Sequence, residues 1–253
     1  MLRTARDLKG ASLIATDGDI GSVQDLYFDD RTWTVRYLVV NTGTWLSGRQ
    51  VLISPRSVAT GGDPASVTVA LSKRQVEGAP SIDMDKPVDR QYEEDYSHYY
   101  GYPYYWGGPN RWGTTMYPSE VAMAGIPITD VPIAATISES QQGDPNLRSA
   151  RDVMGYYIEA TDGDIGHVED FLVDDRLWAI RYMMVDTRNW WPGKKVLVSP
   201  DWIKRVSWAD SRVYVELTRE GVKTAPEYDP DHPIAREYEK ELYHHYKRPT
   251  YWE

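Results

Sequence analysis

Apolar residues along the first third of the chain occur in short blocks, and within several blocks they alternate with polar residues. Five such blocks are rich in β-branched and aromatic residues: 13–16, 20–28, 33–42, 49–53 and 66–71. Gly, Asp, Asn and Ser lie between them, as expected for turns that separate strands. Strands this short and closely spaced predict a small β-barrel or rolled sheet, an architecture that leaves few exposed strand edges.

A helical period follows the strands. Pro87 is acceptable in the first turn of a helix, and acidic residues follow it. Tyr92, Tyr96 and Tyr99 recur at positions i, i+4 and i+7, which places them on one face. We therefore predict a short amphipathic helix near residue 87, followed by an aromatic tail.

The whole pattern occurs twice. "LRTARDLKG" at residue 2 returns as "LRSARDVMG" at residue 147, and "FDDRTWTVRYLVVNT" at residue 28 returns as "VDDRLWAIRYMMVDT" at residue 173. Equivalent residues of the two copies are 145 positions apart up to Pro200, and one inserted residue after Pro200 makes the separation 146. The chain thus reads as a tandem duplication of a unit of about 105 residues, an ordinary size for one domain.

The duplication predicts a mainly β chain with two small barrels in tandem, each followed by a short amphipathic helix and an aromatic tail. The predicted boundaries are 1–84 for the first barrel, 85–106 for its helix and tail, 107–146 for a Gly- and Pro-rich linker, 147–230 for the second barrel, and 231–253 for the last helix and tail. The middle of the linker, "VAMAGIPITDVPIAATI", is too apolar for a free tether, so we expect it to lie along a barrel surface. The two barrels are expected to pack as a pseudo-two-fold pair, as in a homodimer.

The acidic motif "ATDGDIG" stands at 15–21 and again at 160–166. Asp-Gly between two alternating runs is a hairpin signal, because both residues tolerate positive φ. A calcium loop needs acidic groups at alternate positions and a Glu twelve residues in, which neither copy has. The turn is therefore favoured over a weak cation site or a catalytic role, which stay as alternatives.

A second acidic pair, at 29–30 and 174–175, predicts a four-residue hairpin loop in each copy. Phe28 would then face Trp33, and counting back pairs Asp25 with Arg36. The same count pairs Asp170 with Arg181. A cross-strand ion pair is favoured over a general base, because no nucleophile or histidine accompanies these aspartates.

The composition narrows the chemistry further. The net charge of −10 and the pI near 5.0 argue against a phosphate-binding surface, and Arg49, Lys194 and Lys195 flank only one hairpin, so we expect no nucleic-acid partner. The absence of cysteine excludes thiolate nucleophiles and zinc-thiolate sites.

Histidines occur at the helix ends as His98, His244 and His245, and Glu241 lies three residues before His244. Two groups do not make a metal site. We find no Ser-His-Asp arrangement and no phosphate-binding or dinucleotide-binding glycine loop. The sequence thus predicts no catalytic, cofactor-binding or metal-binding residues, no cofactor and no enzymatic activity.

The distribution of apolar residues also bears on location. No stretch of 18 apolar residues occurs, and the start "MLRTARDLKG" is too polar for a signal peptide. We expect a cytoplasmic protein without a transmembrane segment.

Aromatic residues are unusually distributed, with 19 Tyr and 10 Trp against 2 Phe. Tyr and Trp carry a polar atom and suit half-wet surfaces and interfaces. The candidate interface anchors are two sets of tryptophans, in the loops after the third strand and in the tails: Trp45, Trp190, Trp191, Trp106 and Trp252. The alternative for each is packing onto its own barrel.

The segment "DGDIGSVQDLYFDDRTWTVRYLVVNT" and its second copy resemble the PRC-barrel domain. That resemblance implies a small, strongly bent β-barrel, found also in the cytoplasmic domain of the photosynthetic reaction-centre H subunit and in a ribosome-maturation factor. In both, the barrel contacts a partner and performs no catalysis.

We therefore expect a non-enzymatic interaction, scaffold or adaptor protein with unidentified protein partners. One alternative is a reaction-centre-associated protein that supports assembly or electron transfer, with peripheral association to a membrane complex. A further alternative is a ribosome- or RNA-associated maturation factor. If only one copy binds a partner, the difference should show where the copies diverge, as at Ser22 and His167, Gly43 and Arg188, or Leu46 and Trp191.

Overall fold

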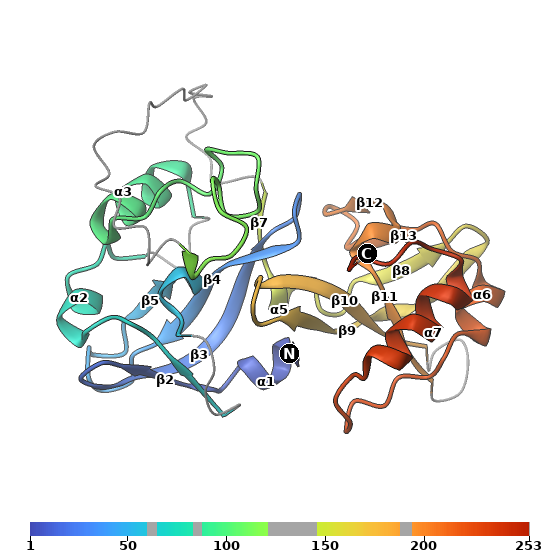
Figure 1. Ribbon diagram of the computed structural model, residues 1–253, viewed down its shortest axis with the longest axis horizontal. Coiled ribbons are helices and arrows are strands. Elements are labelled where there is room, and N and C mark those ends of the chain that lie inside the picture. Colours follow the sequence, from blue (N-terminus) through green and yellow to red (C-terminus); the bar gives the residue numbers. More distant parts are fainter. Residues whose placement is uncertain (60–64, 83–87, 121–145, 188–193, 253) are drawn as a thin grey trace. The chain divides into compact units, whose positions relative to one another are not determined.

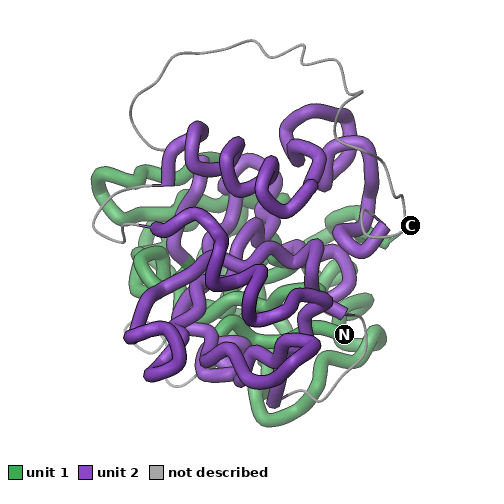
Figure 2. The backbone as a smooth tube through the Cα atoms, turned by 90° about the vertical axis from the view of Figure 1, so that its left-hand side faces the viewer, with its two compact units in different colours: residues 1–5, 150–174, 180–253 green, residues 6–149, 175–179 purple. Residues whose placement is uncertain are grey.

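A computed structural model describes residues 1–59, 65–82, 88–120, 146–187 and 194–252. The described chain is mainly β, as predicted. It divides into two compact units (Figure 2): unit 1 contains residues 1–5, 150–174 and 180–253, and unit 2 contains residues 6–149 and 175–179. Among the described residues, no helix has the length and apolar character needed to cross a bilayer.

Unit 2 is built around an antiparallel run of strands, to which one parallel strand is added (Figure 1). The strands are β2 (Ser12–Ala15), β3 (Gly18–Asp29), β4 (Thr34–Asn41), β5 (Gln50–Ile53) and β6 (Ser66–Thr68), with β6 parallel to β2. The helices are α1 (Ala5–Leu8), the 3-10 turn η1 (Pro55–Ser57), α2 (Lys73–Glu77) and α3 (Arg90–Tyr100).

Unit 1 repeats this order of elements and has one further strand, β12, after its 3-10 turn. Its strands are β8 (Tyr157–Ala160), β9 (Gly163–Asp174), β10 (Ala179–Asp186), β11 (Lys195–Val198), β12 (Ile203–Ser207) and β13 (Arg212–Val215). Its helices are α5 (Ala150–Val153), the 3-10 turn η3 (Pro200–Trp202), α6 (Arg219–Thr224) and α7 (Arg236–Tyr246). Strand β13 runs parallel to β8, as β6 runs parallel to β2.

The first strand of each repeat belongs to the unit formed by the other repeat. Strand β1 (Leu2–Thr4) pairs antiparallel with β9, and strand β7 (Leu147–Ser149) pairs antiparallel with β3. The compact units therefore differ from a division in which 1–84 and 147–230 fold separately. The pattern could not reveal this exchange, because "LRT" and "LRS" fit either acceptor strand.

Helix α3 covers one face of β4 and β5. It begins at Arg90 with Asp89 as N-cap, and Gly101 ends it in the left-handed region at φ 71°. Tyr96 is buried against Tyr37, Val39 and Leu52. The predicted stripe is correct at Tyr92 and Tyr96 but not at Tyr99, which is 42% exposed; Tyr100 packs against the core instead.

The described part of the predicted linker, residues 107–120, is packed against unit 2. Trp112 is only 1% exposed, and it forms a β-bridge with Thr115. The apolar middle of the linker lies outside the described residues.

Candidate functional site

The predicted ion pair between Asp25 and Arg36 is not formed by the strand register. The hairpin closes with Asp29 opposite Thr34, so Phe28 lies opposite Val35, two positions further along β4 than the predicted Trp33. A β-bulge or irregularity at Tyr27/Phe28 adds one more position, and Asp25 therefore lies opposite Val39. The count back from the hairpin started from Phe28 opposite Trp33 and assumed an unbroken ladder, so it missed both shifts. Asp25 accepts hydrogen bonds from the Leu26 amide at 2.8 Å and the Ser149 hydroxyl at 2.5 Å.

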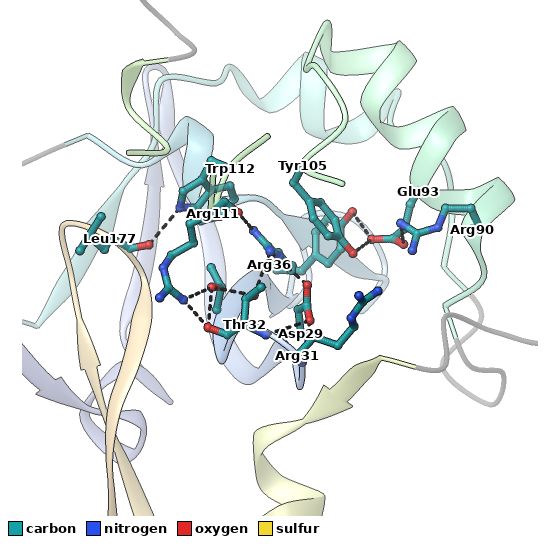
Figure 3. Close-up of polar contacts among 12 residues, drawn as sticks. Asp29, Arg31, Thr32, Arg36, Arg90, Glu93, Tyr105, Arg111, Trp112 and Leu177 are labelled. Atoms are coloured by element: carbon teal, nitrogen blue, oxygen red, sulfur yellow. Dashed lines mark hydrogen bonds and ion pairs between the residues drawn. The ribbon is translucent and has the colours of Figure 1, made fainter. Parts of the chain in front are cut away.

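Arg36 instead pairs with Asp29, one of the two loop aspartates, at 3.1 Å between Nη2 and Oδ2 (Figure 3). Its Nη1 donates to the Arg111 carbonyl at 2.6 Å, and its guanidinium stacks 3.9 Å from the centre of the Tyr105 ring. In the second repeat Arg181 pairs with Asp174, also at 3.1 Å, and stacks on Tyr251. The predicted partner Asp170 is buried, and its Oδ1 accepts a hydrogen bond from the Phe171 amide at 2.7 Å.

Glu93 and Glu239 form a second buried polar arrangement that the sequence analysis missed. Glu93 accepts hydrogen bonds from the Tyr37 and Tyr105 hydroxyls at 3.0 and 2.9 Å, and it pairs with Arg90 at 2.9 Å (Figure 3). Burial, with the nearby Glu93 charge, raises the pKa of Tyr37 well above its ordinary value. The carboxylate thus fastens helix α3 to strand β4 and to the aromatic tail.

The second repeat reproduces this arrangement. Glu239 accepts from the Tyr182 and Tyr251 hydroxyls, both at 2.8 Å, and pairs with Arg236 at 2.9 Å. Burial raises the pKa of Tyr251 to about 12 and also raises the pKa of Tyr182. Both helices begin with the sequence R-x-Y-E, in which Glu follows Arg by three residues, and each tail contains a tyrosine. Together these repeated residues could have predicted the site.

Two arginines of unit 2, Arg36 and Arg56, donate hydrogen bonds to the backbone of segment 111–112. Arg56 donates from Nη2 to the Trp112 carbonyl at 3.0 Å, and burial lowers the pKa of this guanidinium to about 10. Trp112 donates from Nε1 to the Leu177 carbonyl at 3.0 Å, and Arg111 donates to the Thr34 hydroxyl at 2.6 Å (Figure 3). The hydrogen bond from Trp112 to Leu177, with that from the Val35 amide to the Trp178 carbonyl, connects residues 175–179 to the rest of unit 2.

The candidate tryptophans pack on their own units where the structure describes them. Trp106 is half-buried, with the Arg90 guanidinium 3.9 Å from its ring centre, and Trp252 is half-buried, with Arg236 at 4.3 Å. Trp45 is half-buried, with the Lys73 amine at 5.3 Å. Trp190 and Trp191 lie outside the described residues. The role of these five tryptophans as interface anchors stays a prediction.

The two acidic turns are tied to the neighbouring helices. Asp17 accepts from the Lys73 amide at 2.8 Å, and Asp162 accepts from the Arg219 amide at 2.7 Å, each at the first residue of α2 or α6. Asp164 pairs with Arg212 at 2.5 Å. Among the described residues, no three His, Asp or Glu side chains are grouped as metal ligands would be.

The basic residues beside the hairpin have internal partners in both repeats. Arg49 donates to the Glu77 and Ala79 carbonyls at the end of α2, and Lys194 donates to the Lys223 carbonyl at the end of α6. Positive charge at a helix C-terminus is favourable. Lys195 pairs with Glu169 at 2.7 Å. Arg49 and Lys194 therefore attach the C-terminal ends of α2 and α6, and Lys195 forms an ion pair between strands β11 and β9.

His98 and His244 are exposed, as is Glu241, while the His245 ring lies 2.7 Å from the Gly221 carbonyl. The structure thus brings His245 to the start of α6 and leaves His244 and Glu241 in solvent.

The two repeats differ most clearly on the outward face of β8, β13 and β12. We call this the Tyr–Arg face and define it as Tyr157, Glu159, Arg205, Arg212 and Tyr214. Arg212 lies opposite Tyr157, and Tyr214 lies opposite both Glu159 and Arg205, so the five side chains share one side of the sheet. Their neighbours Ile158, Val213 and Val215 point into the core, with exposures of 0–2%.

The corresponding side in the first repeat lacks the aromatic rings and the guanidinium group, and Ile14 stands where the second repeat has Glu159. Ser12 stands where the second repeat has Tyr157, Ser66 where it has Arg212, and Thr68 where it has Tyr214. His167, one of the residues at which the copies diverge, lies opposite Tyr157, as Ser22 lies opposite Ser12. A comparison of the two copies at strand positions, besides the loops, would have found this face from the sequence.

Charge and stacking organise the Tyr–Arg face. Arg212 pairs with Glu159 at 2.9 Å and with Asp164, and these hydrogen bonds raise its pKa. Arg205 stacks 3.5 Å from the centre of the Tyr214 ring. In the part of the chain that the structure describes, Arg205 and its neighbour Lys204 contact no carboxylate, and both are exposed.

Two comparisons with known proteins bear on these observations. The family model of the PRC-barrel domain matches residues 2–70, which confirms the resemblance for the first repeat. A protein of Deinococcus radiodurans described as an uncharacterized protein is 36% identical over 103 residues. That match covers 40% of this chain and 36% of the length of the Deinococcus protein.

Proposed function

This chain contains a PRC-barrel domain, and we propose that it is a non-enzymatic interaction or scaffold protein that binds a protein partner through the Tyr–Arg face. The observation that carries the proposal is that Tyr157, Arg212 and Tyr214 of one repeat are Ser12, Ser66 and Thr68 in the other. The first repeat shows that the fold forms with small residues at these positions. The aromatic and guanidinium groups of the second repeat are therefore additional to what the sheet needs.

The composition of the Tyr–Arg face supports protein binding. Tyr, Trp and Arg are enriched where protein interfaces gain most of their binding energy. Tyr157 is 54% exposed, and Tyr214 is half-buried under the Arg205 guanidinium. A partner that covers these rings would bury apolar area at about 25 cal/mol per Å² without displacing any core residue.

The buried carboxylates support the non-enzymatic part of the proposal. Glu93 and Glu239 each bind two tyrosine hydroxyls and one arginine in the same arrangement. This use joins a helix, a strand and a tail. It gives these acidic groups a structural role in both repeats.

The test compares capture of partners from the native host. Tagged full-length protein would be crosslinked in cells and purified, with a face variant, Tyr157→Ser/Arg212→Ser/Tyr214→Thr, that introduces the residues of the first repeat. We expect the wild type to recover a specific protein, and the face variant to recover at least about tenfold less, since interface hot spots each contribute more than 1 kcal/mol.

The matched control is Ser12→Ala/Ser66→Ala/Thr68→Ala at the equivalent positions of the first repeat, which should recover the partner as the wild type does. Circular dichroism would establish that both variants keep the fold. Equal recovery by wild type and face variant would contradict the proposal.

A further inference from the structure

We propose that a second copy of this chain is also a partner, through exchange of strand β1: β1 of one copy pairs with β9 of another. This proposal rests on the strand pairing of each unit and is independent of the Tyr–Arg face. It identifies the acceptor edge of β9, with the equivalent edge of β3, as a surface that recognises an extended segment of defined sequence.

The two first strands dock in the same register. Leu2, Arg3 and Thr4 lie opposite Asp174, Val173 and Leu172. Leu147, Arg148 and Ser149 lie opposite Asp29, Phe28 and Tyr27. Each β1–β9 pair therefore has an equivalent β7–β3 pair, in which the donor and acceptor repeats are interchanged.

The donor and acceptor sequences are correspondingly alike. The donors read "LRTARD" and "LRSARD", and the acceptors end in "DLYFDD" and "DFLVDD". A strand from one repeat thus already occupies, in this structure, an acceptor that belongs to the other repeat. The recognition does not depend on which stretch of chain supplies the strand.

The contacts of β7 show what the acceptor recognises. The Ser149 hydroxyl donates to Asp25 Oδ2 at 2.5 Å, and the Arg148 guanidinium pairs with Asp30 at 2.8 Å. The Asp30 amide donates to the Asn146 carbonyl at 2.8 Å. A hydroxyl residue after an arginine is the shared feature of both donors, as Arg148-Ser149 and Arg3-Thr4.

The size of the donor makes exchange accessible. Strand β1 has three residues, and all three are only half-buried, so exchange requires the release of only a short, partly exposed segment. The contacts are the same whether the strand comes from the same chain or another, which is what makes strand exchange a low-cost route to oligomers. The balance is then set by concentration, because a tethered strand has an effective concentration of about 1 mM or above.

The test uses the full chain, which contains no cysteine. Two single-cysteine variants, Arg3→Cys and Val173→Cys, would be mixed, unfolded and refolded together at increasing concentration, and then treated with a short thiol crosslinker. Because each chain carries one cysteine, a crosslinked product between the two variants reports β1 of one chain on β9 of another. We expect this product to rise with concentration and to exceed the control by at least tenfold.

The control is Arg3→Cys mixed with Lys204→Cys, an exposed position on β12 that measures random collision. The double variant Arg3→Cys/Val173→Cys measures pairing within one chain. Rapid crosslinking within the double variant, with no product above the control in the mixture at any concentration, would overturn the proposal.

A second measurement covers the case in which Val173→Cys does not fold, since Val173 is fully buried. Wild-type protein should elute as monomer and dimer, with a dimer fraction that rises with protein concentration and falls on dilution, because concentration sets the balance between pairing within one chain and pairing between two chains. A single monomer peak at every concentration would also overturn the proposal. The face variant defined above should exchange β1 as the wild type does. A failure of strand exchange would therefore not contradict partner binding through the Tyr–Arg face.

Discussion

Single residues at the centre of each unit join elements that are distant in the sequence. Glu93 connects β4, α3 and the following tail through Tyr37, Arg90 and Tyr105. Its removal would leave two phenol hydroxyls buried, and an unsatisfied buried polar group costs about 1–3 kcal/mol. The repetition at Glu239 indicates that this connection is part of the fold.

The buried tyrosines predict a loss of stability in alkaline solution. Burial raises the pKa of Tyr37, Tyr96 and Tyr182 above the ordinary value of 10.0. A group with a raised pKa in the folded state contributes stability that is complete below the unfolded pKa and is lost as the pH rises above it. We expect the urea midpoint to fall above pH about 10.

Ultraviolet titration would check the assignment, since phenolate absorbs differently from phenol. Part of the tyrosine signal should appear only with unfolding. Complete and reversible ionisation of all tyrosines near pH 10 in the folded protein would argue against the buried network.

Asp25 and Arg36 mark the limit of prediction at this scale. The sequence pattern predicted Asp25 as the partner of this arginine, but the partner is Asp29. Counting positions from a loop assumes that each residue faces one other residue. The irregularity at Tyr27/Phe28 breaks that rule, and the hairpin also closes at Asp29 and Thr34 instead of at Phe28 and Trp33.

Helices and strands followed the sequence pattern more closely than the pairs of residues did. Alternation predicted strands at 13–16 and 49–53, and the structure has them at Ser12–Ala15 and Gln50–Ile53. The Asp-Gly turns were also predicted. Their additional role, as ligands of a helix start through Asp17 and Asp162, needed the structure, because α2 lies more than fifty residues along the chain from the first turn.

This role gives a prediction for the turn aspartates. Asp17→Ala and Asp162→Ala should each lower the free energy of unfolding by about 1 kcal/mol, since each removes a side-chain acceptor from the first turn of a helix. The exposed Asp19 is the matched control, and Asp19→Ala should change stability by less than about 0.5 kcal/mol. Urea denaturation measures all three, and equal effects would contradict the capping role.

The sequence could not predict that β1 and β7 each pair with a strand of the other repeat, because the two strands have nearly the same sequence. Both first strands carry the same pattern, so no comparison of residues assigns either one to its acceptor. Only the three-dimensional pairing of β1 with β9 and of β7 with β3 does so.

At the scale of the whole molecule, each repeat contributes to both compact units, which predicts cooperative unfolding. Gly166 has φ 136°, and a Cβ there would lie 2.1 Å from the Asp186 carbonyl oxygen. Gly166→Ala should therefore cost about 3 kcal/mol or more. We expect circular dichroism and tryptophan fluorescence to shift together to a lower urea midpoint in one transition.

Gly155→Ala is the matched control, because Gly155 also has positive φ, at 93°, but no atom lies within 4 Å of the added Cβ. It should cost about 1 kcal/mol. Two separated transitions in Gly166→Ala would show that the units unfold independently and would contradict the prediction.

The pairing of β1 and β7 across the repeats has a consequence for symmetry. In a homodimer of single repeats, any substitution appears on both subunits, so Tyr157 could not arise without a second tyrosine at the position of Ser12. Joining the repeats in one chain removes that constraint while keeping the exchanged strands. One repeat has Tyr157, Arg212 and Tyr214 on this face where the other has Ser and Thr, and the stoichiometry expected for a partner of the Tyr–Arg face is accordingly one per chain.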